Sequence, residues 1–497
     1  MHIDLIYLRK EVVSTKLQPL LLLLAVGLCA IFFGILSSTA NPLLIGIGLS
    51  LIIGPFLLIK PELTIWLILI IGFLFGVITA SPKYGKFAWF LSILSTLLLL
   101  PSFLNMVWSK RYVTPNFIKL ALVFMLYAIL VSLIHGGSMQ EFVGGFKRYF
   151  QSYGLMLALF LTSVSANTYR SWTKFLLVAA LLQFPFALYE LLVLVPLRGG
   201  LALSSETTDV VAGTFGANLE GGSPNTVMVI FLFIAVAFLV ARKRSGVLST
   251  NRFILFTIIC LLPLGMGETK IAVIMLPLVG LILLKKDLTA SPSRAIPMIL
   301  GLGVFTALLG YLYVALIMNS TLETVINNTL RYNVGDQGYS KGVYLNRFTS
   351  ITFWFEQQGF DDPLSFLIGN GIGSSYVAEE GISGHIGLRY PNYAISLTSL
   401  STLLWDTGII GLSLFTGIFI SAWKAAGRLI EEVKDPVVRQ DGLAIQAAIS
   451  LFLLSFIYSD MIVNLVSFEL IYAIILGYLA YLMNQHGLLR KTIALPY

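Results

Sequence analysis

The basic side chains beside long apolar stretches are the residues of this sequence whose type and position could do chemistry. The four that matter most are Arg148, Lys270, Arg331 and Arg347. Arginine can hold a phosphate through two parallel hydrogen bonds, and lysine acts as a compact point charge. Each alone is explained equally well by snorkelling or by an ion pair, as between Lys270 and Glu268. If they share one face of a membrane, they form an anion site suited to a membrane-borne pyrophosphate.

The elements that must position these side chains are transmembrane helices. Of the 497 residues, 57% are hydrophobic and only 11% are charged, whereas soluble proteins carry about 25% charged residues. A helix needs about 20 apolar residues to cross the hydrocarbon core, and its backbone groups are satisfied internally. The sequence therefore predicts an all-α, polytopic bundle of about fourteen spans. They are 17–40, 42–60, 62–81, 87–108, 117–135, 149–167, 174–196, 225–241, 253–268, 271–284, 296–318, 397–423, 443–462 and 464–484.

The distribution of the 32 Lys and Arg residues gives an orientation. With both termini in the cytoplasm, every short cytoplasmic loop carries at least one base, which is the positive-inside pattern. The net charge of +8 is thereby a topology signal and does not indicate a nucleic-acid partner. We expect a multi-pass protein of the cytoplasmic membrane with one large outer loop before the last three helices. The expected parts are N-terminal helices (1–114), a transmembrane core (115–318), the large loop (319–396) and C-terminal helices with a cytoplasmic tail (397–497).

The large loop is rich in aromatic residues, among them Phe353, Trp354 and Tyr390. Two interpretations are compatible with this density: an aromatic belt at the membrane surface and stacking against sugar rings. The stretch Asn346–Gln357 predicts a short amphipathic helix. A loop of this length without structure would be uncommon, so we expect it to be functional.

Carboxylates within the expected spans form a second group of costly residues. They are Glu190, Asp406, Asp460 and Glu469. All four fall in the outer part of their spans, where ionisable groups usually face a cavity or a partner. They predict either a hydrated outer vestibule or local pairing of each acid with a neighbouring base or amide.

A glycine-rich stretch, Gly369–Ser374, follows a short apolar run in the large loop. It lacks the spacing and surroundings of a dinucleotide fingerprint, so it predicts a turn near the membrane surface, with contact to substrate left open. Cys29 and Cys260 lie in apolar runs and are expected to pack there. No Cys/His cluster has zinc spacing, and we expect neither a metal nor a cofactor.

Residues 115–485 resemble the O-antigen ligase and Wzy-type polysaccharide polymerase superfamily. The architecture is similar, with its large outer loop just before the last three helices. The segment Leu367–Ser374 (LIGNGIGS) resembles the family's glycine-rich stretch, and Leu404–Leu412 (LWDTGIIGL) is similar to the family's "ETGxxGL". Arg148, Lys270 and Arg347 lie where the family places essential cations.

The chain departs from the family at two points. The family often has a His-Asn pair about eleven residues before the glycine matched here by Gly408, where this chain has Leu397 and Thr398. The histidines expected outside, His135 and His385, do not fit that spacing. The missing histidine favours a polymerase over a ligase.

The resemblance implies a metal-independent glycosyltransferase that joins oligosaccharide repeats carried on polyprenyl pyrophosphate at the outer membrane face. The implied partners are this lipid-linked oligosaccharide, the bilayer and a protein that regulates chain length. The pyrophosphate ligands implied are Arg148, Lys270 and Arg347, with Arg331 as a further cation. The candidates for the general base are Glu268, His385 and Asp406. The alternatives are ligase-type transfer to another acceptor and a transporter of lipid-linked oligosaccharide.

Overall fold

The fold is described from a computed structural model. The structure describes four single positions (27, 31, 34 and 54) and the ranges 57–76, 88–108, 113–162, 164–197, 210–219, 224–267, 270–316, 321–335, 345–359, 361–377 and 383–489. The chain divides into two compact units, Met1–Ile65 and Trp66–Tyr497, and the contacts discussed below are those of the second unit. Both expected spans 17–40 and 42–60 fall almost wholly outside the described residues.

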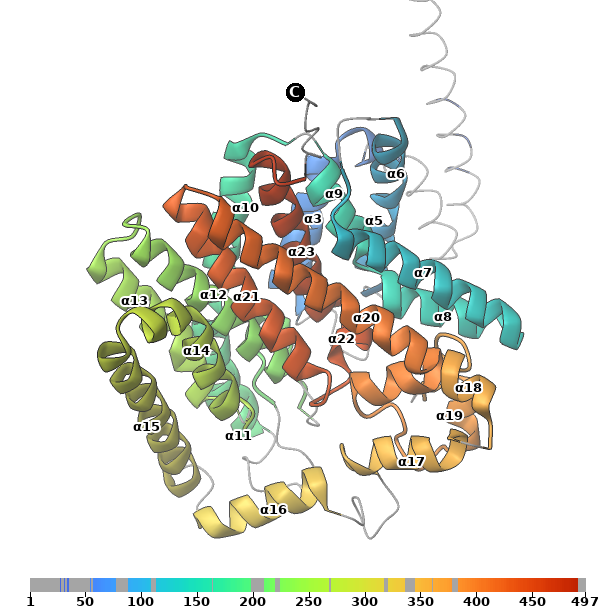
Figure 1. The fold of residues 1–497 in the computed structure, drawn as a ribbon. Coiled ribbons are helices and arrows are strands. Elements are labelled where there is room, and N and C mark those ends of the chain that lie inside the picture. The colour runs from blue at the N-terminus through green and yellow to red at the C-terminus, as the bar shows by residue number, and fades with distance from the viewer. Residues whose placement is uncertain are drawn as a thin grey trace, which may run out of the picture. The chain divides into compact units, whose positions relative to one another are not determined.

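Within the described ranges every regular element is a helix, which confirms the all-α prediction for that part of the chain. Figure 1 shows their arrangement. The helices before residue 200 are α3 (Pro61–Leu74), α5 (Ala88–Leu97), α6 (Leu99–Trp108), α7 (Asn116–His135), α8 (Met139–Phe150), α9 (Tyr153–Leu161), α10 (Ala166–Tyr189), η2 (Glu190–Leu194) and α11 (Val195–Leu197). The middle ones are η3 (Gly213–Phe215), α12 (Asn225–Arg244), α13 (Thr250–Leu261), η4 (Leu262–Gly265), α14 (Ala272–Ala290), α15 (Pro292–Leu316) and α16 (Leu322–Val334). The last ones are α17 (Thr349–Gln358), α18 (Pro363–Ile368), α19 (His385–Arg389), α20 (Ser399–Glu432), α21 (Pro436–Ser455), α22 (Met461–Asn464) and α23 (Val466–Gln485).

Among the residues that the structure describes, seven helices are long and apolar enough to cross a membrane. They are Trp89–Met106, Asn116–His135, Ala166–Leu197, Asn225–Arg244, Ser399–Glu432, Pro436–Ser455 and Val466–Gln485. Seven of the fourteen expected spans coincide with them, so the structure supports a membrane protein. The total of fourteen stays a prediction.

One expected span differs clearly from the structure. The span 149–167 corresponds to α9, which has only nine residues, because the helix before it ends at Phe150 and Gln151–Ser152 breaks the run. The side chains at this break are buried and face polar partners, with Gln151 Nε2 donating to Glu469 Oε1 at 2.6 Å. A polar junction inside the bundle therefore replaces a continuous apolar span.

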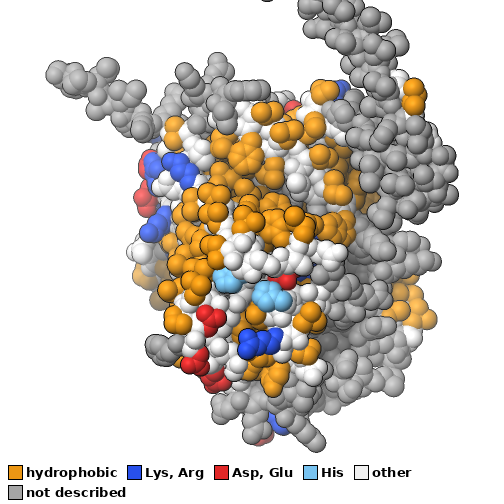
Figure 2. Space-filling model, turned by 90° about the vertical axis from the view of Figure 1, so that its right-hand side faces the viewer, with side chains coloured by type: hydrophobic (Ala, Val, Ile, Leu, Met, Phe, Trp, Pro, Cys, Tyr) orange, Lys and Arg blue, Asp and Glu red, His pale blue; other side chains and the backbone are white. Residues whose placement is uncertain are grey.

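The core of the large unit lies between α12, α21 and α23. These are the most buried of the seven long helices, with 78%, 67% and 72% of their apolar windows inside the protein. Phe452 of α21 and Tyr472 of α23 pack against each other, and both contact Phe419 of the neighbouring α20. Peripheral helices keep apolar residues on the outside, and Figure 2 shows hydrophobic side chains over much of one face. Such a surface is suited to lipid.

The described residues of the segment expected as a large loop form four helices, α16 to α19. The predicted helix at Asn346–Gln357 is confirmed as α17, displaced by a few residues. Figure 1 shows α17, α18 and α19 around the N-terminal end of α20, and α17 and α18 pack against it. Phe353 stacks on Tyr393 and Trp354 on Phe366, with ring centroids 5.0 and 4.8 Å apart. These aromatic residues thus build the loop's own core, while Phe348 and Phe355 remain exposed.

Candidate functional site

The short helix α8 is the platform of the candidate site. Ser138 caps it by accepting a hydrogen bond from the Glu141 backbone N–H at 3.1 Å. Residues spaced by four and three positions share one face of a helix, and here they are Glu141, Gly145 and Arg148. A Cβ on Gly145 would overlap the carbonyl of Ile372, so glycine is required for the close approach of the glycine-rich loop. This face of α8 therefore lies along that loop.

The loop that passes over α8 is the glycine-rich motif, and it docks onto the start of α20. The backbone N–H groups of Asn370 and Gly371 donate to the carbonyls of Trp405 and Asp406 at 3.0 and 2.9 Å. The helix is interrupted at Gly408, where φ is 63° and a side chain would be strained. The two sequence motifs, which are 29 residues apart in the chain, are thus one structural unit.

Asp406 is the centre of this unit and is 1% exposed. Its Oδ1 accepts from Ser374 Oγ at 2.9 Å and from the Ser375 N–H at 2.8 Å. Its Oδ2 accepts from Tyr149 Oη at 3.0 Å and from the Gly373 N–H at 2.9 Å. Because both oxygens are occupied and shielded, the geometry revises the expectation of a general base. Asp406 is a positioning residue that fixes the loop to α8 and α20.

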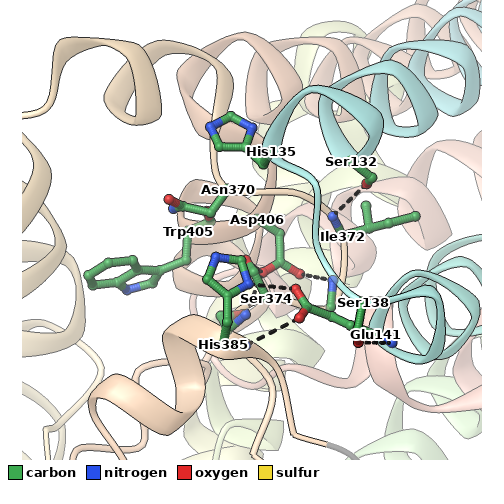
Figure 3. A network of polar contacts seen from close by, with 12 residues as sticks. Ser132, His135, Ser138, Glu141, Asn370, Ile372, Ser374, His385, Trp405 and Asp406 are labelled. Carbon is green, nitrogen blue, oxygen red and sulfur yellow. Dashed lines mark hydrogen bonds and ion pairs between the residues drawn. The ribbon is translucent and has the colours of Figure 1, made fainter.

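His385 and Glu141 form a histidine–carboxylate pair at the open side of this unit. His385 Nδ1 lies 2.8 Å from Glu141 Oε1, and the His385 backbone N–H donates to Oε2 at 3.3 Å. The imidazole is 45% exposed and the carboxylate 7%. Figure 3 shows Glu141, His385 and Asp406 converging from three elements, with His135 at the end of α7 nearby. In Figure 2 exposed histidine side chains adjoin acidic and basic groups below the apolar surface.

The electrostatics of this pair suit proton transfer. The hydrogen bond that His385 makes to Glu141 raises the pKa of His385, and desolvation partly opposes this. Glu141 accepts at both oxygens, so we assign the proton of neutral His385 to Nδ1, which leaves Nε2 available as a base. A histidine oriented by a carboxylate is the usual arrangement of a general acid–base catalyst.

Arg148 lies on the same face of α8 as Glu141, two turns further on. Its guanidinium carbon stands 3.0 Å from the ring centroid of Tyr376, whose carbonyl accepts from the Gly384 N–H at 2.8 Å. The turn after the glycine motif thereby links the arginine to the residue preceding His385. Burial lowers the pKa of Arg148, while Tyr376 and Asp406 act to raise it. No ion pair to Arg148 occurs within the described ranges, so its charge is available to an anion.

The structure separates the other expected cations. Arg347 stacks on Tyr458 at 4.4 Å, and its guanidinium donates to the Tyr458 carbonyl and to Asn333 Oδ1. It thus fastens the segment before α17 to the turn between α21 and α22. Lys270, at the start of α14, and Arg331, in the last turn of α16, are both exposed. Among the residues that the structure describes, no contact joins either of them to Arg148, so the expected cluster of cations is not assembled by direct contacts.

The expected acids each have a local partner. Glu268, the first candidate base, lies outside the described residues. Glu190 accepts from the backbone N–H groups of Ala212 and Gly213 at 2.9 and 2.7 Å. Asp460 accepts from Asn464 at 2.6 Å, and Glu469 from Gln151 as described above. These contacts favour local pairing over the hydrated vestibule.

Sequence reasoning missed Glu141 and Tyr376, which position the two groups most suited to chemistry. The pattern Ser138-Met-Gln-Glu141 is a capping-box signature and could have placed the start of α8. That start would have put Glu141 and Arg148 on one face. The pairing of Glu141 with His385 spans more than 240 residues and leaves no local signal.

No group of three or more His, Cys, Asp and Glu side chains suited to a metal occurs in the described part of the chain. No protein-family model matches the chain, and no curated protein matches it. The functional assignment therefore depends on the geometry of the site and on the motifs themselves.

Proposed function

We propose that this protein is a membrane glycosyltransferase of the polysaccharide-polymerase type. It has about fourteen spans with both termini in the cytoplasm, and it works at the outer face of the cytoplasmic membrane. Its donor is a saccharide on polyprenyl pyrophosphate, and its acceptor is a sugar hydroxyl on a second lipid-linked unit. The single observation that carries the proposal is the convergence of the His385–Glu141 pair and the available Arg148 on the glycine-rich loop.

The reaction proposed is a displacement at the anomeric carbon of the donor. The acceptor oxygen forms the new glycosidic bond as the bond from that carbon to the pyrophosphate oxygen breaks. His385 Nε2 takes the hydroxyl proton, and Glu141 stabilises the resulting imidazolium. Arg148 stabilises the negative charge that develops on the departing polyprenyl pyrophosphate, an effect that is strong in a partly desolvated site.

The geometry supports this division of labour on α8. Glu141 and Arg148 are seven residues apart, which at a rise of 1.5 Å per residue is about 10 Å along the helix. An acid–base group and an anion-binding group at that separation can flank a sugar and its attached pyrophosphate. Asp406 keeps the loop between them in place without forming an ion pair with Arg148.

The test is a product assay with the purified full-length protein in liposomes and polyprenyl-pyrophosphate oligosaccharide as substrate. The proposal predicts a ladder of longer glycans on a gel. His385→Asn should lower the rate about 10²–10⁴-fold, because the proton acceptor is removed. His135→Asn is the matched control, since its Nδ1 is bonded only to the Val131 carbonyl of its own helix among the described residues, and it should leave the rate unchanged.

Three outcomes would contradict the proposal. A single shift onto a different acceptor indicates a ligase, and accumulation of unmodified substrate across the membrane indicates a transporter. A ladder formed by His385→Asn at the wild-type rate would exclude the histidine from the reaction.

A further inference from the structure

A cavity of about 600 Å³ lies between α10, α12 and α23, with Leu69 and Phe73 of α3 completing its wall. Its volume falls in the range of roughly 300–1,000 Å³ that is usual for small-molecule sites. It touches none of the residues assigned to the glycan site. Its lining is mainly aliphatic and aromatic, as by Phe231, Ile234 and Ile475.

The cavity is polarised along α12. The helix contributes lining residues from Phe231 to Arg242, and eleven steps of 1.5 Å give a length of about 16 Å. The first of these residues is apolar and the last is charged. Arg170 and Lys174, from the first three turns of α10, also line the cavity, and the contacts of Tyr478 with Tyr169 and with Asp441, the partner of Arg242, place them at the charged end. An apolar body with a basic end matches the two parts of a phospholipid.

The bases at this end differ in how much charge they offer. Arg242 is paired with both oxygens of Asp441 at 2.6 and 2.9 Å, so its charge is compensated. Arg170 and Lys174 are exposed, and neither forms an ion pair with any carboxylate that the structure describes. Two uncompensated cations at the mouth of an apolar cavity favour an anionic headgroup over a zwitterionic one.

A buried donor gives an independent indication of a ligand. Trp172 lines the cavity and is 2% exposed, and its indole Nε1–H has no hydrogen-bond partner among the described residues. A buried donor without an acceptor is costly, and native proteins rarely leave one unsatisfied. An ester carbonyl or phosphate oxygen of a phospholipid would supply the missing acceptor.

We propose that this cavity binds a phospholipid with an anionic headgroup, its acyl chains along α12 and α23 and its headgroup at Arg170 and Lys174. Neighbouring aromatic residues, with Tyr169 stacked on Tyr481 at 3.8 Å, are typical of the membrane–water interface at which headgroups lie. The proposal is independent of the glycan reaction, because the site shares no residue with it.

The test is native mass spectrometry of the full-length protein in detergent, incubated with phosphatidylglycerol or with phosphatidylcholine of the same acyl chains. We expect phosphatidylglycerol to be retained in preference. Arg170→Gln with Lys174→Gln should weaken that retention roughly tenfold or more, because two headgroup charges are lost. Ala235→Trp should also reduce it by filling the apolar part of the cavity, which Ala235 lines.

The matched control is Lys119→Gln with Lys424→Gln, which removes the same charge from exposed positions outside the cavity and should retain phosphatidylglycerol normally. Equal retention of both lipids by the wild type would overturn the anionic headgroup. Unchanged retention in the Arg170/Lys174 variant would overturn the site. If Ala235→Trp does not fold, as judged by gel filtration, the charge variants decide the question.

Discussion

Two buried aspartates, Asp406 in α20 and Asp441 in α21, are each 1% exposed but are compensated in different ways. Asp406 is held by uncharged donors, two backbone N–H groups and two hydroxyls. Asp441 is held by the two terminal nitrogens of Arg242 and by the Tyr478 hydroxyl at 2.8 Å. The contacts of Asp406 hold the glycine-rich loop on α20. The contacts of Asp441 connect α12, α21 and α23.

The difference determines which arginine can take part in chemistry. Arg242 has its charge neutralised by a carboxylate and serves the fold. Arg148 lies near Asp406, whose charge acts to raise its pKa, but it forms no ion pair with any carboxylate that the structure describes, so its guanidinium can still bind an anion. A buried acid whose oxygens all accept from neutral donors therefore leaves the hydrogen-bond donors of a neighbouring cation available.

The largest expected effect on stability is at the Arg242–Asp441 ion pair. Asp441→Ala leaves Arg242 without its carboxylate partner and should lower the free energy of unfolding by about 3–5 kcal/mol. The double variant Asp441→Leu with Arg242→Met should recover most of this loss, because no unpaired charge remains. Thermal unfolding in detergent measures both, and an unchanged melting temperature for Asp441→Ala would show that the pair contributes little.

The opposite behaviour is expected at Arg148. Arg148→Gln should lower the rate of glycan transfer about 10²–10³-fold, which is the usual cost of losing one preorganised charge-stabilising group. Its melting temperature should stay near that of the wild type, since no described carboxylate loses a partner. Arg389→Gln, an exposed arginine on the helix that carries His385, is the control for both measurements. A stable, fully active Arg148→Gln protein would contradict the functional role that distinguishes Arg148 from Arg242.

A smaller effect is expected where α8 meets the loop. Gly145→Ala places a methyl group against the Ile372 carbonyl and should lower the free energy of unfolding by about 1–3 kcal/mol. Gly144→Ala on the same helix meets open space and should raise it by up to about 1 kcal/mol. Paired thermal melts measure the contrast, and equal effects of the two substitutions would mean that the loop is not seated on this face.

The smallest effect is a shift in pH dependence. Glu141 raises the pKa of His385, so the base form is lost, and the rate falls, as pH decreases through that raised value. Glu141→Gln should lower the pKa of His385 and thereby move the acid limb of the pH–rate profile to lower pH. His135→Asn should leave the limb in place. Because the pKa of His385 is raised in the folded protein, the His385–Glu141 pair stabilises the fold below the ordinary histidine pKa. This contribution is lost as pH rises through the raised pKa.

Local patterns in the sequence were sufficient for several features. Apolar runs of about 20 residues located the seven long helices, and amphipathic spacing located α17. The two glycine-containing motifs were recognised separately. Their direct pairing through Asp406 was not, because hydrogen bonds between segments depend on the path of the chain between them.

The contacts of individual charged residues could not be predicted from the sequence, for a physical reason. The side of the membrane on which a charge lies follows from counting loops, but its partner depends on packing within a few ångströms. Asp406 was the last of three candidate bases, and the structure shows its carboxylate accepting from four donors. Arg347 was expected to face substrate and is engaged with Tyr458 and Asn333. Neither set of contacts can be predicted from the residues adjacent in sequence.

By itself the sequence determined that this is a helical membrane protein whose unusual polar residues gather in a few segments, because burying so many apolar residues requires lipid. Only the tertiary structure decided which polar groups stay available. The capping of α8 by Ser138 aims Glu141 and Arg148 along one face, and the break at Gly408 brings the glycine loop onto that face. His385 then meets Glu141 across the fold, since contacts between distant segments depend on packing, which local sequence does not encode.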